Sequence, residues 1–252
     1  MRSALYRFAL GVFFVTIANR AVAANDDLST MTYEGTLGAQ RIGLTLAVRQ
    51  GKVIPKSHYF YAKYLKDIPL SGRADREISL QEPGSGTFAL RFRGNGSNGS
   101  APLNFDNSVG LEGRWTGKDG KSFPVMLSNV SDPGEGALPG TRWYRDVTDK
   151  SDAAFEAQVQ GFYKAVLAGD RAGAARYVSF PLRVNVAPGK PLMVKDGAQL
   201  AAQWERIFSP AWLQLAAQAM PHDLSVIRGQ AMLGSGLAFF GDRGAEVVNP
   251  AQ

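Results

Sequence analysis

The residues best suited to proton transfer in this sequence are its two histidines, His58 and His222. An imidazole titrates near neutral pH and can act as a general base when it is held within hydrogen-bond reach of a substrate. His222 stands between Pro221 and Asp223, in a segment expected to be a loop, whereas His58 begins an aromatic stretch of an expected strand. Nothing in the sequence brings either ring to a substrate. We therefore expect a surface or helix-end role for His222 and a structural role for His58.

Other catalytic arrangements lack their sequence signatures. No Gly-x-Ser-x-Gly elbow is present, and the absence of cysteine excludes a thiolate zinc site, a cysteine nucleophile and disulfides. Glu34 and Glu112 each lie beside glycine in an expected strand, as a glycosidase pair could, but alternation places both on a face in contact with water. Two histidines are too few for a histidine-rich metal site, and acidic clusters are missing. We expect no catalytic residues, no metal and no cofactor.

Aromatic and basic side chains gather in one part of the sequence. Tyr59 and Tyr61 share one face of an expected strand and lie near Lys63, a combination suited to binding a sugar or peptide. Burial of the aromatic rings in a β core is the simpler expectation for part of this set. The full set of ligand-binding candidates is Tyr59, Tyr61, Lys63, Arg91, Arg93, Arg183, Asn185 and Trp204, of which the last three could line a pocket in the second half of the chain.

The positive charge of the chain is concentrated. The 252 residues carry a net charge of +6, and residues 40–93 alone hold ten basic side chains against four acidic ones. A basic surface there would attract an anionic component of the cell envelope or an acidic protein, although charge on the solvated face of a sheet explains it equally well. Nucleic acid is not an expected partner of an exported protein.

The first 23 residues have the pattern of an export signal. Arg2 and Arg7 precede an uncharged run, Phe8–Ala18, and Ala21-Val22-Ala23 offers the small residues that a signal peptidase reads. As a helix this run would span about 16 Å, roughly half the hydrocarbon core of a bilayer. We predict cleavage after Ala23, a periplasmic or secreted protein, and no transmembrane segment afterwards. The mature chain would keep 25 basic and 22 acidic residues, a charge of +3.

Residues 31–130 have the pattern of an antiparallel β-rich module. Short β-prone runs alternate with glycine, proline and asparagine and predict six or seven strands, at 31–37, 41–48, 57–64, 77–81, 87–92, 110–116 and 123–127. In the second run Ile42, Leu44 and Leu46 share one face, and Arg41 and Thr45 lie on the other, which we expect to contact water. A β sandwich or a small barrel satisfies this pattern.

The rest of the chain has helical periodicity mixed with strands. Residues 131–141 contain two Pro-Gly steps and are expected to be a linker, followed by an α+β domain over 145–250. A stripe of apolar residues from Phe155 to Leu167 predicts a helix, and Asp170, Asp196 and Ser209 are expected to cap three further helices. Strands are expected at 180–186, 192–194, 231–240 and 245–249.

Several phrases of the sequence carry a resemblance to a known family. They are Phe-Pro-Leu-Arg-Val-Asn at 180–185, Ile-Phe-Ser at 207–209 and Gly-Gln-Ala-Met-Leu-Gly-Ser-Gly at 229–236. This half resembles the cystatin-like cone of the nuclear-transport-factor-like superfamily, as found in uncharacterised exported bacterial two-domain proteins. The amino-terminal half, with its phrases at 33–37, 59–61, 68–72 and 113–115, is similar to a β-rich module of comparable proteins. The resemblance implies a cone that can enclose a pocket, and it carries over no catalytic residue.

We therefore expect an α+β protein with an amino-terminal antiparallel β sandwich or small barrel and a carboxy-terminal cystatin-like cone. The expected function is that of a noncatalytic periplasmic binding or interaction protein with a basic surface on its β module. Two alternatives remain: a small-molecule enzyme that uses the cone pocket, and an inhibitor of an envelope hydrolase that inserts the glycine-rich loop 94–101 into its target. An apolar cavity holding a buried carboxylate or histidine with a shifted pKa would favour the enzyme.

Overall fold

The structure is a computed structural model that describes residues 28–97, 101–186 and 189–251. The expected signal peptide lies outside the described residues, and so does the centre of the loop 94–101. In the part of the chain that is described, none of the helices is both long enough and apolar enough to span a bilayer.

The first half of the chain forms one antiparallel sheet of ten strands, in the order β1-β10-β9-β8-β7-β6-β3-β2-β4-β5. The strands are β1 (Leu28–Leu37), β2 (Gln40–Arg49), β3 (Lys52–Val53), β4 (His58–Tyr61), β5 (Ile68–Pro69), β6 (Ser71–Ala74), β7 (Glu77–Glu82), β8 (Gly86–Arg93), β9 (Gly110–Gly117) and β10 (Ser122–Ser131). Because β1 pairs with β10 on one side and with β2 on the other, eight of these strands close into a barrel. The prediction of a small barrel is confirmed.

The interior of the barrel is filled by the apolar faces that alternation predicts. Ile42, Leu44 and Leu46 of β2 are at most 1% exposed and pack with Leu80 and Phe88 from the opposite strands. Closure of the ring gives each strand a partner on both sides, so that the barrel leaves few unpaired edges. The strand β4 pairs with residues 42–45 of β2, on the same edge that β3 occupies at residues 48–49, and β5 pairs with β4.

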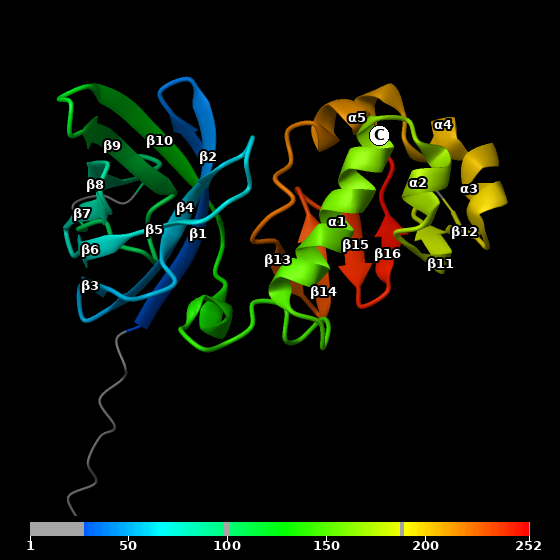
Figure 1. Cartoon of the computed structure of the whole chain (residues 1–252), viewed down its shortest axis with the longest axis horizontal. Coiled ribbons are helices and arrows are strands. Elements are labelled where there is room, and N and C mark those ends of the chain that lie inside the picture. The colour runs from blue at the N-terminus through cyan, green and yellow to red at the C-terminus, as the bar shows by residue number, and fades with distance from the viewer. Residues whose placement is uncertain (1–27, 98–100, 187–188, 252) are drawn as a thin grey trace, which may run out of the picture.

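The middle of the outer face of β2 is shielded from water, contrary to the expectation from its alternation, and only Arg41 and Arg49 near its ends are partly exposed. Thr45 and Ala47 are 1% and 0% exposed, and Ala47 belongs to the hydrophobic core of the second half of the chain. The polar residue Thr45 is buried because the second half packs over this side of the barrel, as Figure 1 shows. Alternation predicts which side chains share a face, but it does not reveal what covers that face.

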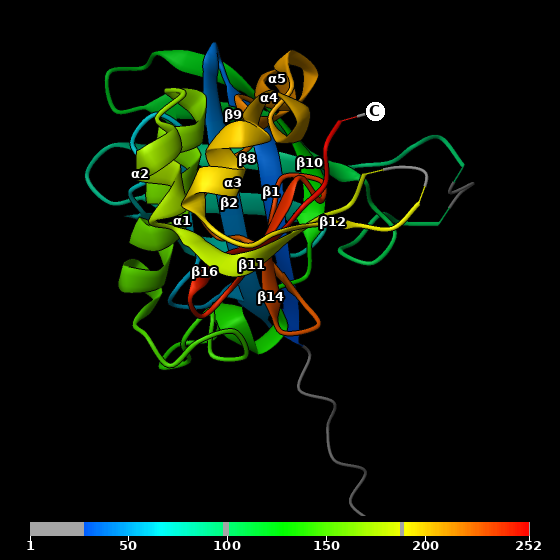
Figure 2. The same ribbon diagram turned by 90° about the vertical axis from the view of Figure 1, so that its right-hand side faces the viewer.

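The second half of the chain combines helices with a six-stranded sheet in the order β12-β11-β16-β15-β14-β13. Its elements are the 3-10 helix η1 (Gly134–Ala137), α1 (Asp152–Leu167), α2 (Arg171–Ala175), β11 (Val178–Val184), β12 (Leu192–Val194), α3 (Gly197–Ala202), α4 (Trp204–Ile207), α5 (Pro210–Ala216), β13 (Ser225–Ile227), β14 (Gln230–Leu233), β15 (Ala238–Gly241) and β16 (Gly244–Val248). All strand pairs are antiparallel except β11–β16. Figures 1 and 2 show α1 running along the sheet, with α2 to α5 gathered toward one end. The α+β assignment is confirmed.

The helix caps expected from the sequence are present. The side chain of Asp170 accepts a hydrogen bond from Gly173 N, that of Asp196 from Gln199 N, and that of Ser209 from Trp212 N. The single strand expected at 231–240 is wrong, because Gly234 and Gly236 have positive φ values of 58° and 91° and form a turn between β14 and β15.

The segment between the two sheets is packed against the barrel. Ala137 in η1 is fully buried, and the Lys56 ammonium donates hydrogen bonds to Gly136 O at 2.5 Å and Thr141 O at 2.6 Å. The same ammonium lies 5.9 Å from the centre of the Trp143 ring. The residues expected to form a linker therefore take part in the contact between the two halves.

Gly43 of β2 provides a test of this packing. A Cβ atom there would lie 2.2 Å from Cζ of Phe60, and the Phe60 ring also packs against His222, whose ring centre is 4.5 Å away. Because Phe60 is only 3% exposed and its ring would have to shift, we predict that Gly43→Ala lowers the free energy of unfolding by about 1–3 kcal/mol in urea denaturation. The matched control is Gly136→Ala, where the nearest atom is 3.5 Å away and a change below about 0.5 kcal/mol is expected. Equal effects of the two substitutions would contradict the packing described.

Candidate functional site

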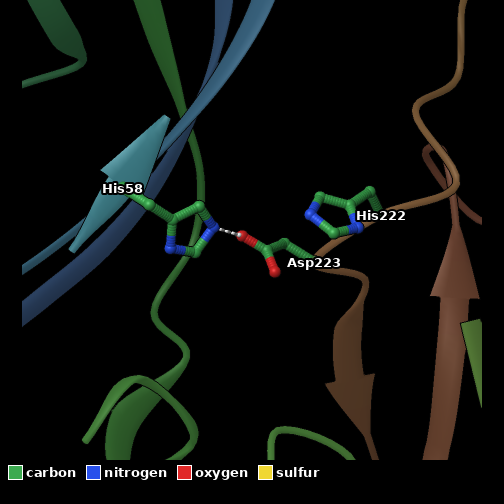
Figure 3. A group of neighbouring side chains, drawn as sticks. All are labelled: His58, His222 and Asp223. Carbon is green, nitrogen blue, oxygen red and sulfur yellow. Dashed lines mark hydrogen bonds and ion pairs between the residues drawn. The ribbon is translucent and has the colours of Figure 1, made fainter. Parts of the chain in front are cut away.

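Five ionisable side chains meet where the barrel contacts the second half of the chain. His58 and Asp67 come from the barrel side, and Glu156, His222 and Asp223 from the other; we call these five residues the junction cluster. Figure 3 shows His58 on β4 facing Asp223 and His222, which lie on the segment between α5 and β13. The two histidines are the only ones in the chain.

His58 is fixed by its position on β4. This strand pairs with β2, with His58 opposite Thr45, so both side chains project from the outer face of the barrel. The Nδ1 atom of His58 lies 2.7 Å from Lys56 O, and its Nε2 atom lies 2.7 Å from Oδ2 of Asp223. Thr45 donates its hydroxyl to the same carboxylate oxygen at 2.7 Å. One carboxylate of the second half is therefore bound by two side chains of the barrel.

His222 makes the corresponding contacts from the opposite side. Its Nδ1 atom lies 2.5 Å from Oε2 of Glu156 on α1, and its Nε2 atom lies 2.7 Å from Oδ1 of Asp67. Glu156 is oriented by the Tyr144 hydroxyl, which donates to its other oxygen at 2.9 Å. The His58 Nε2 atom is also 3.3 Å from Oδ1 of Asp67, so the inner nitrogens of both rings face the same carboxylate.

The backbone at Asp223 adopts an unusual conformation. Its φ of 49° lies in the left-handed region, which residues other than glycine rarely occupy. The Asp223 amide donates to Glu156 at 3.1 Å, and the next amide, of Leu224, donates to the Tyr144 hydroxyl at 3.0 Å. These hydrogen bonds hold a strained residue in the position from which its carboxylate reaches the barrel, a feature often found at functional sites.

The electrostatic balance of the cluster favours its charged forms. Burial alone would lower the pKa of His222, but its hydrogen bonds to Asp67 and Glu156 and the surrounding carboxylates outweigh burial and raise the pKa to about 10. The pKa of His58 is raised in the same way, since burial is outweighed by the hydrogen bond and charge of Asp223. Burial raises the pKa of Asp223, but the two histidines and Thr45 lower it by more than burial raises it, so that the pKa lies below its ordinary value.

The cluster also contains the donor types that a metal ion prefers. Ligand atoms of His58, His222 and Asp223 all lie within 4.8 Å of one another. The expectation of no metal site rested on the small number of histidines, and the fold brings both of them to one place.

A cleft of about 660 Å³ opens beside the junction cluster. We call it the interface cleft because residues of both halves line it. Its apolar lining is Val130, Leu215, Ala219, Met220, Leu224, Met232 and Leu237; its polar lining is Glu34, Asn129, Gln218, His222, Asp223, Ser225 and Ser235, with Gly234 completing the wall. Burial raises the pKa of Glu34, although Arg41 acts in the opposite direction.

The ligand-binding candidates on the β module are not brought together by the fold. Tyr59 is 1% exposed in the barrel core, with its ring 5.2 Å from that of Phe88, and Tyr61 is half-buried beside it. Lys63 is exposed and lies over the exposed ring of Tyr64.

The two arginine candidates of the barrel already have partners. Arg91 forms an ion pair with Glu112 at 2.7 Å, and Arg93 donates to Ser128 at 3.0 Å and to the Leu127 carbonyl. The two glutamates considered as a glycosidase pair have different surroundings: Glu112 forms the ion pair with Arg91, and Glu34 lines the interface cleft.

The candidates of the second half have structural contacts as well. Arg183, which is exposed on β11, donates to Asn185 at 2.7 Å, and Asn185 donates at the same distance to Asn249, which follows β16. Trp204 is 4% exposed and packs against Phe208.

From the sequence, His58 was expected to be structural and His222 to lie at the surface or at a helix end. Neither was expected to contact Asp67, Glu156 or Asp223. The contact between His58 and Asp223 joins residues 165 positions apart, and no local pattern encodes it. The one available signal was that each histidine has an aspartate near it in the sequence, Asp67 for His58 and Asp223 for His222.

No protein-family model, no curated protein and no solved structure matches this chain. The function is therefore argued from the geometry of the junction cluster and the interface cleft alone.

The raised pKa of His222 predicts a dependence of stability on pH. The folded pKa of about 10 lies above the ordinary value of 6.5, so the stabilisation is complete below about pH 6.5 and is lost as the pH rises through about 10. For metal-free protein we predict that the free energy of unfolding falls by roughly 2–4 kcal/mol between pH 6.5 and pH 10. Urea denaturation at a series of pH values measures it.

The control is His222→Gln, which keeps hydrogen-bonding capacity without a titrating ring. Its stability should change less over the same pH range. If the curves of the two proteins run parallel, His222 is not the group responsible.

Proposed function

We propose that this protein is a noncatalytic binding protein that takes a small amphipathic ligand in the interface cleft. The observation that carries the proposal is the cleft itself, which at about 660 Å³ falls in the range of small-molecule sites and adjoins the buried charges of the junction cluster. Sites of this kind commonly lie between domains, with mostly apolar walls and a few polar groups that fix the orientation of the ligand.

The lining of the cleft defines the chemistry of the ligand. Leu215 is 53% exposed and Val130 is 48% exposed, so large apolar side chains face the space from both halves of the chain. Glu34 and Asp223 contribute carboxylate oxygens, which accept hydrogen bonds and attract positive charge. The ligand that fits has an apolar body and a hydrogen-bond donor or cationic group.

The hydrogen bonding of the junction cluster argues against catalysis. Both nitrogens of His58 and both nitrogens of His222 already contact oxygen atoms of the protein. A general base needs a free lone pair within reach of the substrate, and neither ring offers one toward the cleft. The shifted pKa values that would have favoured an enzyme thus belong to groups that are occupied with one another.

The proposed site lies between the halves and not inside the second one. The interior of the second half is occupied by Phe162, Phe208, Trp212 and Phe240, each at most 1% exposed.

We also propose that this half is a cone of the nuclear-transport-factor-like type. This is supported by its leading helices α1 and α2, the hairpin β11–β12, and the closing strands that bring β16 beside β11.

The proposal does not depend on the basic surface expected from the sequence. Several of those basic side chains have partners: Arg41 donates to Gln218 O and Lys56 to Gly136 O across the junction, and Arg73 pairs with Asp75 on the barrel. The proposed location in the periplasm or outside the cell rests on the sequence pattern of residues 1–23.

Binding of a neutral apolar probe tests the proposal. N-phenyl-1-naphthylamine combines an apolar ring system with one N–H donor and fluoresces more strongly in an apolar site. We predict saturable binding of one probe per chain, and a loss of affinity of about tenfold or more in Ser235→Trp, because the indole would occupy the cleft from an exposed turn.

The matched control is Met193→Trp, at an exposed position on β12 that does not line the cleft. It should bind the probe as the unchanged protein does. Absence of saturable binding, or equal binding by the two tryptophan variants, would contradict the proposed site.

A further inference from the structure

We propose that the junction cluster is a binding site for a divalent transition metal ion of the zinc class, with His58, His222, Asp67 and Asp223 as ligands. This inference goes beyond the proposed function, because the ion would be held by the protein alone and not by the ligand of the cleft.

The first argument is the orientation of the two imidazole rings. The Nδ1 atom of His58 faces the carbonyl oxygen of Lys56, which can only accept a hydrogen bond, so the proton must be on Nδ1. The Nδ1 atom of His222 faces Glu156, whose oxygens also accept from the Tyr144 hydroxyl and the Asp223 amide. If a metal ion displaces the proton from Nε2 of each ring, both rings can keep the Nδ1 proton and its hydrogen bond, and the Nε2 lone pairs are then available to the ion.

The Nε2 atoms of both rings are directed at the same small space. Asp67 Oδ1 lies 3.3 Å from Nε2 of His58 and 2.7 Å from Nε2 of His222. Asp223 Oδ2 lies 2.7 Å from Nε2 of His58, and Figure 3 shows the His222 ring beside the same carboxylate. Two nitrogen and two oxygen ligand atoms thus converge, and each histidine is held from behind by a hydrogen-bond acceptor, the Lys56 carbonyl for His58 and Glu156 for His222.

The distances fit a tetrahedral ion after small movements. Metal–ligand bonds of about 2.0–2.2 Å in a tetrahedron place the donor atoms roughly 3.3–3.5 Å apart. The 3.3 Å separation of His58 Nε2 and Asp67 Oδ1 already has this length, and the separations of 2.7 Å would open by several tenths of an ångström. Asp67 can follow such a movement because its side chain is 55% exposed, whereas the histidines and Asp223 are buried and anchored.

The hydrogen bonds behind the ligands are those that metal sites use. Histidine ligands commonly donate their second N–H group to a carboxylate or a backbone carbonyl, and His222 and His58 show one case of each. Thr45 orients Asp223 by donating to its carboxylate. Two carboxylates balance the charge of a divalent ion, and imidazole nitrogens favour zinc over magnesium or calcium.

The location of the site gives the ion a structural role. His58 and Asp67 belong to the barrel side and His222 and Asp223 to the second half, so the ion would join the two halves directly. Four protein ligands fill a tetrahedral zinc site and leave no open position for a substrate, as in structural zinc centres.

The test is a zinc titration of untagged protein that has been stripped with a chelator. Isothermal titration calorimetry, with metal content measured after dialysis, should give one zinc ion per chain with Kd below about 1 μM. Excess magnesium should not compete, and Co²⁺ in place of zinc should give the intense visible absorption of tetrahedral coordination.

Two variants separate this site from adventitious binding. We expect Asp67→Asn to weaken zinc binding about tenfold or more, because the exposed carboxylate can be neutralised without disturbing the fold. Asp75→Asn is the matched control, since its side chain is 54% exposed and pairs with Arg73 on another part of the barrel. His222→Gln should abolish stoichiometric binding. If the protein takes up no stoichiometric zinc, or if Asp67→Asn and His222→Gln bind it as tightly as Asp75→Asn does, the metal site is refuted whether or not the cleft binds its probe.

Discussion

The structure depends on the burial of the Asp223 carboxylate between the two halves of the chain. A buried carboxylate is costly unless it is paired and hydrogen-bonded, and Asp223 finds both kinds of partner in the barrel, in His58 and Thr45. Because the side chains that hydrogen-bond its Oδ2 atom come from the barrel, this contact specifies how the two halves meet. The apolar contact of Ala47 with the second core supplies burial, while the hydrogen bonds of Asp223 specify where the surfaces meet.

Several features that look separate follow from this contact. The middle of the outer face of β2 is covered, Phe60 packs against both Gly43 and His222, and Asp223 takes a left-handed backbone conformation. The interface cleft lies beside this contact, and His222 and Asp223 form part of its wall. A site for a ligand and a candidate site for a metal ion thus share one origin, namely the polar groups that position the barrel on the second half.

Much of the fold could be predicted from local patterns. Alternation identified the inward face of β2, and the caps Asp170, Asp196 and Ser209 marked the starts of helices, because such signals act over a few residues. The two-residue strands β3 and β5 were missed because they are too short to show a period. The single strand expected at 231–240 was wrong because Gly234, with a φ of 58°, begins a turn there. The junction cluster could not be predicted, since it arises only when residues 165 positions apart are packed together. The candidate binding residues of the aromatic strand do not form a site for a related reason. A tyrosine suits both a binding surface and a protein core, and Tyr59, which is 1% exposed, lies in the core.

A double-mutant cycle between His58 and Asp223 tests the central claim most directly. The free energy of unfolding of metal-free protein would be measured in urea for the unchanged chain, His58→Gln, Asp223→Asn and the double variant. If the pair joins the two halves as described, the two substitutions are strongly non-additive, with a coupling energy of about 1.5 kcal/mol or more. Additivity within about 0.5 kcal/mol would show that the two side chains do not stabilise each other across the junction, and would contradict the account.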